Sequence, residues 1–377
     1  MRTETAAVDG FDGREASDDQ RQVSAVRTGS TGRSRRVFPW CESARRDYGI
    51  VALVSRTGWT AKTGVGRYLR HRYPHYDQLR QRPSGAADSS VDRIQDAVIL
   101  VDGPGPRPVA GGAFHQRIGL LYQDVDLARS GASSGRRRAL GGGGSRPDPI
   151  WDCLCRRTLD LARQLRGARV DVTDVEEIEL AQLCAVLTLY EQVDVSRREL
   201  PITTARASAP VKELLTWVRD DDVRDVVAMT ALYADHFPRN LATEPVVVEP
   251  NMHPGWADLL LGGLLLELKT SASAQISDEF AYTLLGHLLL TSDDFPTPGV
   301  PVTHVGWYFA RHALPWVFQV DDFLTLMAGT NVTLAEARSE FDQLLSFPED
   351  TPEWMITLMK TPVTRARLSR PGRAGPP

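Results

Sequence analysis

The sequence predicts an α/β domain with a mixed central β-sheet flanked by helices, and an added helical region on its N-terminal side. Two observations support this fold class. Apolar residues at helical spacing run through 150–237, whereas short apolar runs typical of strands follow from 244 to 320. A helical pattern at 278–290 interrupts the strands. Helices before and between strands favour a sheet that is covered on both faces.

The helical region has clear start signals. Thr173-Asp174-Val175-Glu176 is a capping box, in which side chains satisfy the free amides at a helix start. Before this region, 48–121 reads as mostly irregular, with one helix opening near Phe114. The remaining helices are expected at 150–165, 173–193, 211–218, 223–237, 321–328 and 334–345.

A Gly-Gly pair at 262–263 separates two apolar runs, 257–262 and 263–270. Only glycine takes positive φ freely at both turn positions, so the pair predicts a two-residue hairpin. Its register pairs 261 with 264, 260 with 265 and 259 with 266, which sets Asp258 opposite Glu267. Further strands are expected at 245–248, 302–310 and 315–320.

Asp258, Glu267 and Lys269 share one face of this hairpin. Directly opposed residues have Cβ atoms about 4.5–5.5 Å apart, and Lys269, two residues after Glu267, points the same way. Leucine fills most of the neighbouring positions, so both faces of the hairpin are expected to be buried. Buried charges are costly unless they are paired or bind a metal ion.

Two interpretations of this charged group are open. A hard divalent cation, Mg²⁺ or Mn²⁺, would offset the repulsion between the carboxylates and leave positions for water and phosphate oxygens. Lys269 could then hold or deprotonate the attacking water, or stabilise charge that develops on phosphorus. The alternative is a structural ion-pair triad in which Lys269 neutralises its neighbours.

These residues resemble the core pattern of the PD-(D/E)XK nuclease superfamily, which is an Asp, a short hairpin and then Glu-x-Lys. Here the pattern is Asp258 followed by Glu267-Leu268-Lys269. The resemblance extends to a RecB-like branch of uncharacterised bacterial proteins. Tyr282–His287 is similar to the helix that follows Glu-x-Lys-Thr in that branch, and Val305–Arg311 is similar to a later strand.

The resemblance implies a restriction-endonuclease-like fold and a metal-dependent nuclease that hydrolyses DNA phosphodiester bonds, with RNA as an open alternative. It implies that Asp258 and Glu267 hold Mg²⁺ or Mn²⁺. Residues 111–115 are similar to the helix start that supplies a metal-binding His in RecB-like enzymes, which makes His115 a third candidate ligand. The other interpretation of His115 is a partly exposed packing residue.

Thr283 and His287 stand where RecB-like nucleases have a Gln and a Tyr that help to position the substrate. We therefore take Tyr282, Thr283, His287 and Arg311 as candidate substrate-positioning residues. Tyr282 has a core contact as its alternative role, and Arg311 has a capping ion pair. The departures raise an alternative function, a catalytically weak or inactive nuclease-fold protein that binds nucleic acid or a protein partner.

Composition narrows the setting. The net charge of −4 over 377 residues excludes a polycation that binds nucleic acid indiscriminately, so any such contact is local. Four cysteines without zinc or redox spacing predict reduced thiols. No apolar run approaches 18 residues and no signal-peptide pattern opens the chain, so we expect a cytoplasmic protein without membrane contact.

Composition also divides the chain. Basic clusters in Gly, Ser or Pro-rich surroundings, such as Arg136–Arg138, read as solvated segments. The expected parts are a disordered leader at 1–36, an N-terminal segment of mixed structure at 37–129, a Gly/Ser/Arg linker at 130–149, a helical layer with the nuclease core at 150–361, whose core motifs span 244–320, and a disordered basic tail at 362–377.

Overall fold

The structure is a computed structural model that describes residues 64–81, 92–102, 108–127, 130–140, 148–196, 209–237, 246–247, 258–291 and 301–346. All of these residues belong to one compact unit, 45–377. The leader expected at 1–36 and the tail expected at 362–377 lie outside the described residues. Among the described helices, none has the length and apolar character needed to cross a lipid bilayer.

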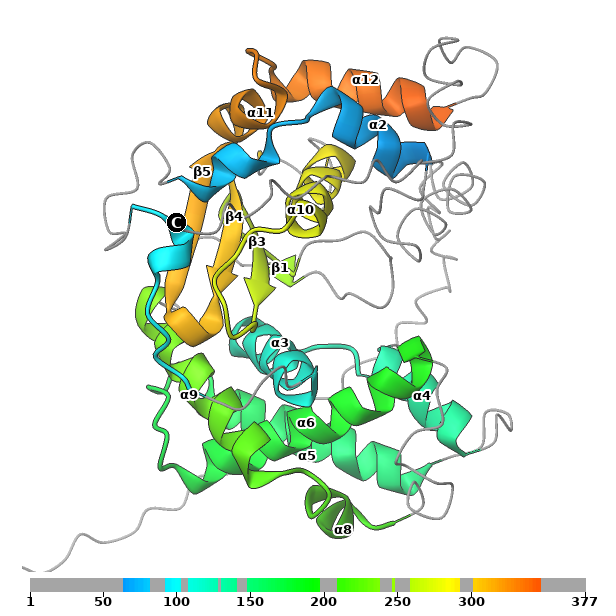
Figure 1. Ribbon diagram of the computed structural model, residues 1–377. Helices are drawn as coiled ribbons and strands as arrows, with labels where there is room; N and C mark the ends of the chain where they lie inside the picture. Colours follow the sequence, from blue (N-terminus) through cyan, green and yellow to red (C-terminus); the bar gives the residue numbers. More distant parts are fainter. Residues whose placement is uncertain are drawn as a thin grey trace, which may run out of the picture. The chain divides into compact units, whose positions relative to one another are not determined.

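One mixed sheet organises the fold, with the strand order β1-β2-β3-β4-β5 (Figure 1). Its strands are β1 Val246–Val247, β2 Leu259–Leu261, β3 Leu264–Lys269, β4 His304–Phe309 and β5 Leu314–Gln319. β3 and β4 are parallel, and every other neighbouring pair is antiparallel. Parallel neighbours need a crossover, and here it carries helix α10, Asp278–Leu290. The predicted mixed sheet is confirmed.

The Gly262-Gly263 hairpin is confirmed in the predicted register. Both glycines have positive φ, 52° and 91°. A Cβ on Gly263 would also lie 2.8 Å from the carbonyl oxygen of Pro301, so the turn needs glycine for space as well as for φ. The paired residues are Leu261 with Leu264, Leu260 with Leu265 and Leu259 with Leu266.

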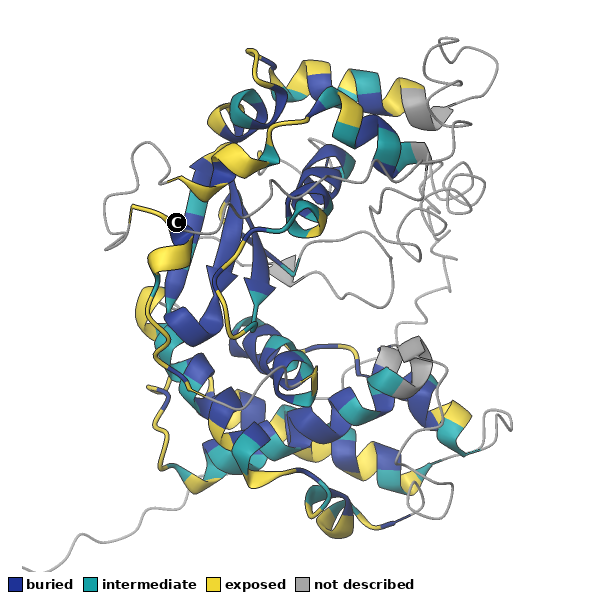
Figure 2. Cartoon of the chain, in the orientation of Figure 1, coloured by how far each residue is buried: buried dark blue, intermediate teal, exposed yellow. Residues whose placement is uncertain are grey.

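The two faces of β3 enter different cores, because successive side chains of a strand point to opposite faces. Leu265 packs in the core that contains α10, whereas Leu266 and Leu268 pack in a second core. β3 and β4 are buried over most of their length, and β5 alternates between buried and partly exposed residues (Figure 2). Glu267 and Lys269 are in phase with Leu265 and therefore lie on the face that α10 covers.

Four helices cover the face that Leu265 occupies: α2 Gly64–Arg72, α10, α11 Val320–Ala328 and α12 Leu334–Ser346. The last three match the predicted helices. α2 lies in the segment that we predicted to be irregular. It has only nine residues and is rich in Arg, so its composition resembles that of a polar loop. Tyr68 and Leu69 are buried in the same core as α10 and α12, and this tertiary packing stabilises the short helix.

Helix α3, Pro108–Tyr122, begins earlier than the predicted opening near Phe114. Proline is favoured in the first turn of a helix, and Gly111 and Gly112 that follow resemble a break in the sequence. Their role is packing. A Cβ on Gly111 would lie 2.7 Å from Oγ1 of Thr270, just after β3, and one on Gly112 would collide with the side chain of Thr188. The two glycines therefore let α3 approach both elements closely.

A helical layer with its own core comprises α4 Gly131–Ala139, α5 Pro149–Leu165, α6 Val175–Ser196 and α8 Val211–Leu215. Helix α9, Asp220–His236, packs in this core and also in the second sheet core, together with α3. The four helices predicted between 150 and 237 are confirmed, with boundary shifts of a few residues.

Residues 131–139 are not the linker that composition suggested, since they form α4. Arg136, which we expected to be solvated, is buried. Its guanidinium lies 2.6 Å from the Asp148 carboxylate and donates to the Tyr190 hydroxyl at 2.6 Å. Composition cannot show these distant partners, which is why an Arg, Gly and Ser-rich segment reads as a linker.

Candidate functional site

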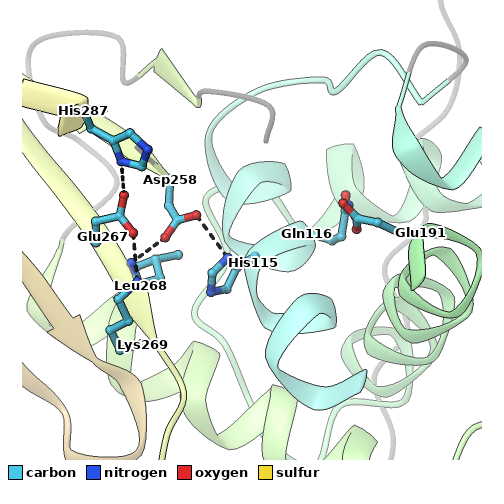
Figure 3. Close-up of polar contacts among 8 residues, drawn as sticks. All are labelled: His115, Gln116, Glu191, Asp258, Glu267, Leu268, Lys269 and His287. Atoms are coloured by element: carbon cyan, nitrogen blue, oxygen red, sulfur yellow. Dashed lines mark hydrogen bonds and ion pairs between the residues drawn. The ribbon is translucent and has the colours of Figure 1, made fainter. Parts of the chain in front are cut away.

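Three segments converge at the C-terminal end of β3 (Figure 3). Asp258 directly precedes β2, while Glu267 and Lys269 lie on β3. His287 approaches from α10 and His115 from α3. The structure therefore brings together both predicted carboxylates, the predicted lysine and the two predicted histidines, and we call these five residues the charged cluster.

Asp258 is held at the entrance to the hairpin by both carboxylate oxygens. Oδ2 accepts a hydrogen bond from the backbone amide of Leu268 at 2.7 Å. Oδ1 lies 3.2 Å from Nδ1 of His115. The first contact fixes the carboxylate against β3, and the second directs it towards α3.

Glu267 is the most enclosed member of the cluster, with a side chain 6% exposed. Its Oε2 accepts from Nζ of Lys269 at 2.9 Å, and Oε1 lies 2.5 Å from Nδ1 of His287. Burial alone would raise the pKa of Glu267, but the charges of Lys269 and His287 and their hydrogen bonds outweigh it and hold the pKa well below its usual range. Glu267 is therefore a carboxylate at neutral pH.

Lys269 contacts an aromatic ring as well as a carboxylate. Its Nζ lies 4.6 Å from the ring centroid of Phe280, in the first turn of α10. Burial would lower the pKa of Lys269, but Glu267 and Asp258 raise it above its usual value. The side chain is therefore an ammonium ion, which suits it to stabilise negative charge and not to accept a proton.

His115 is the most exposed member of the cluster, with 31% of its side chain accessible against 15% for Asp258. Burial would lower the pKa of His115, and the negative charge of Asp258 more than offsets this, so the pKa is raised. Exposure thus rises from Glu267 through Asp258 to His115. The His115 side of the cluster is the side that a ligand reaches first.

Two predicted substrate-positioning residues have structural contacts elsewhere. The Tyr282 hydroxyl donates to the backbone carbonyl of Tyr73 at 2.8 Å in a buried position. Arg311, 2% exposed, pairs with Asp225 at 2.6 Å. It also donates to the carbonyl oxygens of Thr270 and Val101. These contacts match the alternatives weighed for both residues, a core contact and an ion pair.

Thr283 and Phe280 share the helix face of His287, because residues three, four and seven positions apart on a helix lie together. Thr283 is partly exposed one turn before His287. Phe280 was missed as a site residue in the sequence, although its spacing from His287 places it on the face that meets Lys269. A search of the helix after Glu-x-Lys for an aromatic residue in this phase would have found it.

The donor set of the cluster fits a divalent cation in its chemistry. Asp258 and Glu267 are oxygen donors of the kind that Mg²⁺ prefers, and an imidazole such as His115 suits Mn²⁺. The 3.2 Å between the His115 nitrogen and the Asp258 oxygen is close to the roughly 3 Å between adjacent ligands of a six-coordinate ion. Within the described ranges, no three His, Cys, Asp or Glu side chains are already arranged around a common point for a metal ion.

Comparison with known proteins gives no match for this chain among protein-family models, curated proteins or solved structures. What the charged cluster does is therefore argued from its own geometry.

Proposed function

We propose that this chain is a metal-dependent nuclease with a restriction-endonuclease-like fold, which hydrolyses DNA phosphodiester bonds at the charged cluster. The observation that supports it most is the position of Lys269, a partly buried ammonium, 16% exposed, next to two carboxylates on one face of a hairpin. A one-to-one ion pair needs a single carboxylate. The second carboxylate, Asp258, faces the more exposed side with His115.

In this proposal Asp258 and Glu267 hold Mg²⁺ or Mn²⁺, with His115 as a third ligand from α3. A cation held there would supply Lewis-acid chemistry that offsets charge on the phosphate. Lys269 donates to a phosphate oxygen and stabilises the charge that develops as water attacks phosphorus and the ester oxygen leaves. His287 contacts Oε1 of Glu267 and so orients this carboxylate, as groups behind metal ligands commonly do.

The cellular setting is part of the proposal. Cys153, Cys155 and Cys184 are free thiols. Free thiols are maintained in a reducing compartment, which supports a cytoplasmic enzyme acting on DNA there.

A second candidate, a nuclease-fold protein that binds nucleic acid without cutting it, is favoured by one observation. Both carboxylate oxygens of Glu267 already have protein partners, Lys269 and His287. A cation that uses Glu267 shares or displaces one of these contacts. If a cation can neither share nor displace these contacts, the cluster is a closed ion-pair network, and the protein binds nucleic acid without cutting it.

The test is digestion of linear, circular and single-stranded DNA with Mg²⁺, Mn²⁺ or EDTA. Asp258→Asn and Lys269→Met are expected to abolish metal-dependent cleavage. Their matched controls are Asp322→Asn on α11 and Lys212→Met on α8, both at exposed positions, and these variants are expected to leave cleavage unchanged. Circular dichroism of each variant establishes that it is folded.

The outcomes separate the two candidates. Cleavage that needs metal and is lost in both cluster variants supports the nuclease. Salt-sensitive DNA binding without cleavage by folded wild-type protein supports the binding protein instead. Full cleavage by Asp258→Asn would refute the assignment of the site.

A further inference from the structure

A cavity lies beside α10, and its lining includes no residue of the charged cluster. The cavity has a volume of about 360 Å³, and its described lining comes from residues 76–80, residues 94–95 and the loop that enters α10. Pockets for small organic ligands measure roughly 300–1,000 Å³, so the space suits one nucleoside-sized group. Its polar lining comprises Tyr76, Arg80, Gln95, Gln275, Ser277 and Asp278.

The cavity and the charged cluster share the first turn of α10. Ser277 lines the cavity, and its hydroxyl oxygen accepts from the backbone amide of Phe280 at 3.1 Å, which caps the helix. The Phe280 ring in turn contacts Nζ of Lys269. Ser277 of the cavity and Phe280, which contacts Lys269, are therefore about one helical turn, or 5.4 Å, apart.

Two neighbouring tyrosine rings lie beside the cavity, with one guanidinium group at each end of the series. The Arg80 guanidinium lies 5.6 Å from the Tyr76 ring centroid, and the Tyr76 ring lies 6.1 Å from that of Tyr282. Arg70 continues the series at 4.4 Å over Tyr282. Proteins bind unpaired bases by stacking them on aromatic rings and guanidinium planes, so Tyr76 and Arg80, which line the cavity, form a surface of the right kind. Tyr282 is buried and packs against Tyr76.

The other lining residues supply an apolar floor and a hydrogen-bonding rim. Ile94 and Ile276 line the cavity and are buried at its base. Gln95 and Gln275 are exposed at its edge. A primary amide both donates and accepts, which is what the edge of a base requires.

The charges at the rim are unequal. Asp278 pairs with Arg70 at 3.1 Å. Arg80 donates to the carbonyl oxygen of Ile276 at 3.4 Å, and in the part of the chain that the structure describes it forms no ion pair with a carboxylate. Arg80 therefore retains a positive charge for a phosphate next to the cavity.

We propose that this cavity binds an unpaired nucleobase of a single-stranded nucleic acid, with Tyr76 as the stacking surface, Gln95 and Gln275 at the base edge and Arg80 on the adjoining phosphate. The inference rests on the proposed nuclease function and specifies its substrate class. Bases stacked in a duplex cannot enter the cavity, so the strand that reaches the charged cluster is single-stranded or has an unpaired end.

The test measures fluorescence anisotropy of a labelled single strand of about 12 nucleotides, and of the matching duplex, with Ca²⁺ in place of Mg²⁺ to limit turnover. The double variant Gln95→Ala with Gln275→Ala is expected to bind the single strand about tenfold more weakly than wild type. Gln78→Ala is the matched control, because Gln78 is an exposed residue of the same segment that does not line the cavity. Tyr76→Phe should keep the affinity, and Tyr76→Leu should lower it.

A duplex that binds as tightly as the single strand overturns the inference, as does equal affinity in the cavity variants and the Gln78→Ala control. A free mononucleotide that competes at micromolar concentration would identify the cavity as a site for free nucleotides instead. DNA digestion by the same preparations separates the two proposals. Metal-dependent cleavage with unchanged affinity in the cavity variants refutes only the cavity, whereas wild-type protein that neither binds nor cuts DNA refutes both.

Discussion

Two regions of this protein hold buried charges in different arrangements. In the helical layer, Arg117 of α3 meets Glu177 of α6 through two parallel hydrogen bonds of 2.6 and 2.7 Å. Both side chains are almost fully enclosed, at 1% and 2% exposure. At the end of β3, two carboxylates share one lysine and two histidines through single contacts, and exposure rises towards His115.

A structural ion pair and a candidate site differ in the number of charged partners and in the geometry of their hydrogen bonds. A bidentate pair between one guanidinium and one carboxylate uses the strongest hydrogen bonds of both partners and leaves no place for a ligand. Single contacts leave lone pairs on each carboxylate oxygen, and the exposed side lets a ligand reach them. Burial alone would not distinguish the two regions.

The largest expected effect on stability is in the helical layer. Glu177→Gln leaves the Arg117 guanidinium buried beside a neutral amide. Breaking a buried pair by removing one charge costs about 3–5 kcal/mol, so chemical denaturation should show a loss of that size in the free energy of unfolding. A loss below about 1 kcal/mol would show that water or another group already compensates Arg117.

Glu267→Gln is expected to affect cleavage more than stability. Because Asp258 remains near Lys269, the variant is expected to lose less stability than Glu177→Gln. Metal-dependent cleavage should fall more than about 100-fold, since a direct ligand matters at least as much as the groups behind it. Equal losses of stability in the two glutamate variants, with cleavage unaffected, would remove the distinction between the regions.

Gly112→Ala tests how the two regions are joined. The added methyl would collide with the Thr188 side chain of α6 and push α3 away from it. Overpacking of this kind costs about 1–3 kcal/mol, and a small displacement of His115 should lower cleavage as well. The measurements are the midpoint of thermal unfolding and the cleavage rate, with Gly167→Ala as a control in open space. Gly167 has φ 86°, so that control carries a small backbone cost of its own.

Phe280→Leu should have a smaller effect, confined to the charged cluster. Loss of the cation–π contact to Lys269 is worth about 0.5–2 kcal/mol, which corresponds to a fall of a few-fold to roughly 30-fold in kcat. Phe280→Trp keeps an aromatic face and should retain most of the rate. If Phe280→Leu and Phe280→Trp have the same kcat, the ring of Phe280 acts only by filling space.

The smallest predicted effect is the response of the cluster to acid. The pKa of Glu267 is lowered in the folded state, so its contribution to stability is complete above its ordinary pKa of about 4.3 and is lost as the pH falls further. The difference in melting temperature between wild type and Glu267→Gln should therefore narrow below about pH 4.5. A difference that stays constant from neutral pH to about pH 3 would contradict the assigned charge of Glu267.

Local patterns made most of the sheet region predictable. The hairpin register followed from Gly262-Gly263 alone, because a two-residue turn leaves one pairing. Helix α10 was predicted with its observed bounds, since its capping residue Ser277 and its apolar run are both local signals. The same register places Asp258, Glu267 and Lys269 on one face, so the center of the candidate site followed from the sequence.

Elements that depend on distant partners were missed. α2 and α4 are short and rich in arginine, and their buried contacts come from residues far along the chain, such as Tyr190 for Arg136. The interior position of Arg311 depends on Asp225 of α9, so the residues around Arg311 in the sequence could not decide between its two roles. The helix phase of Phe280 relative to His287 was visible in the sequence, but its contact with Lys269 also depends on the packing of α10 on β3.

Helix α10 carries Phe280, His287 and the capping contact of Ser277 on one rigid rod. Along such a rod, an inserted residue rotates everything that follows it by about 100° and advances it by about 1.5 Å. One residue added between Phe280 and His287 would turn the imidazole away from Glu267, while one added at 271–273 would be taken up by the loop. We therefore expect related chains to vary in length before this helix and to keep the interval from 280 to 287 constant.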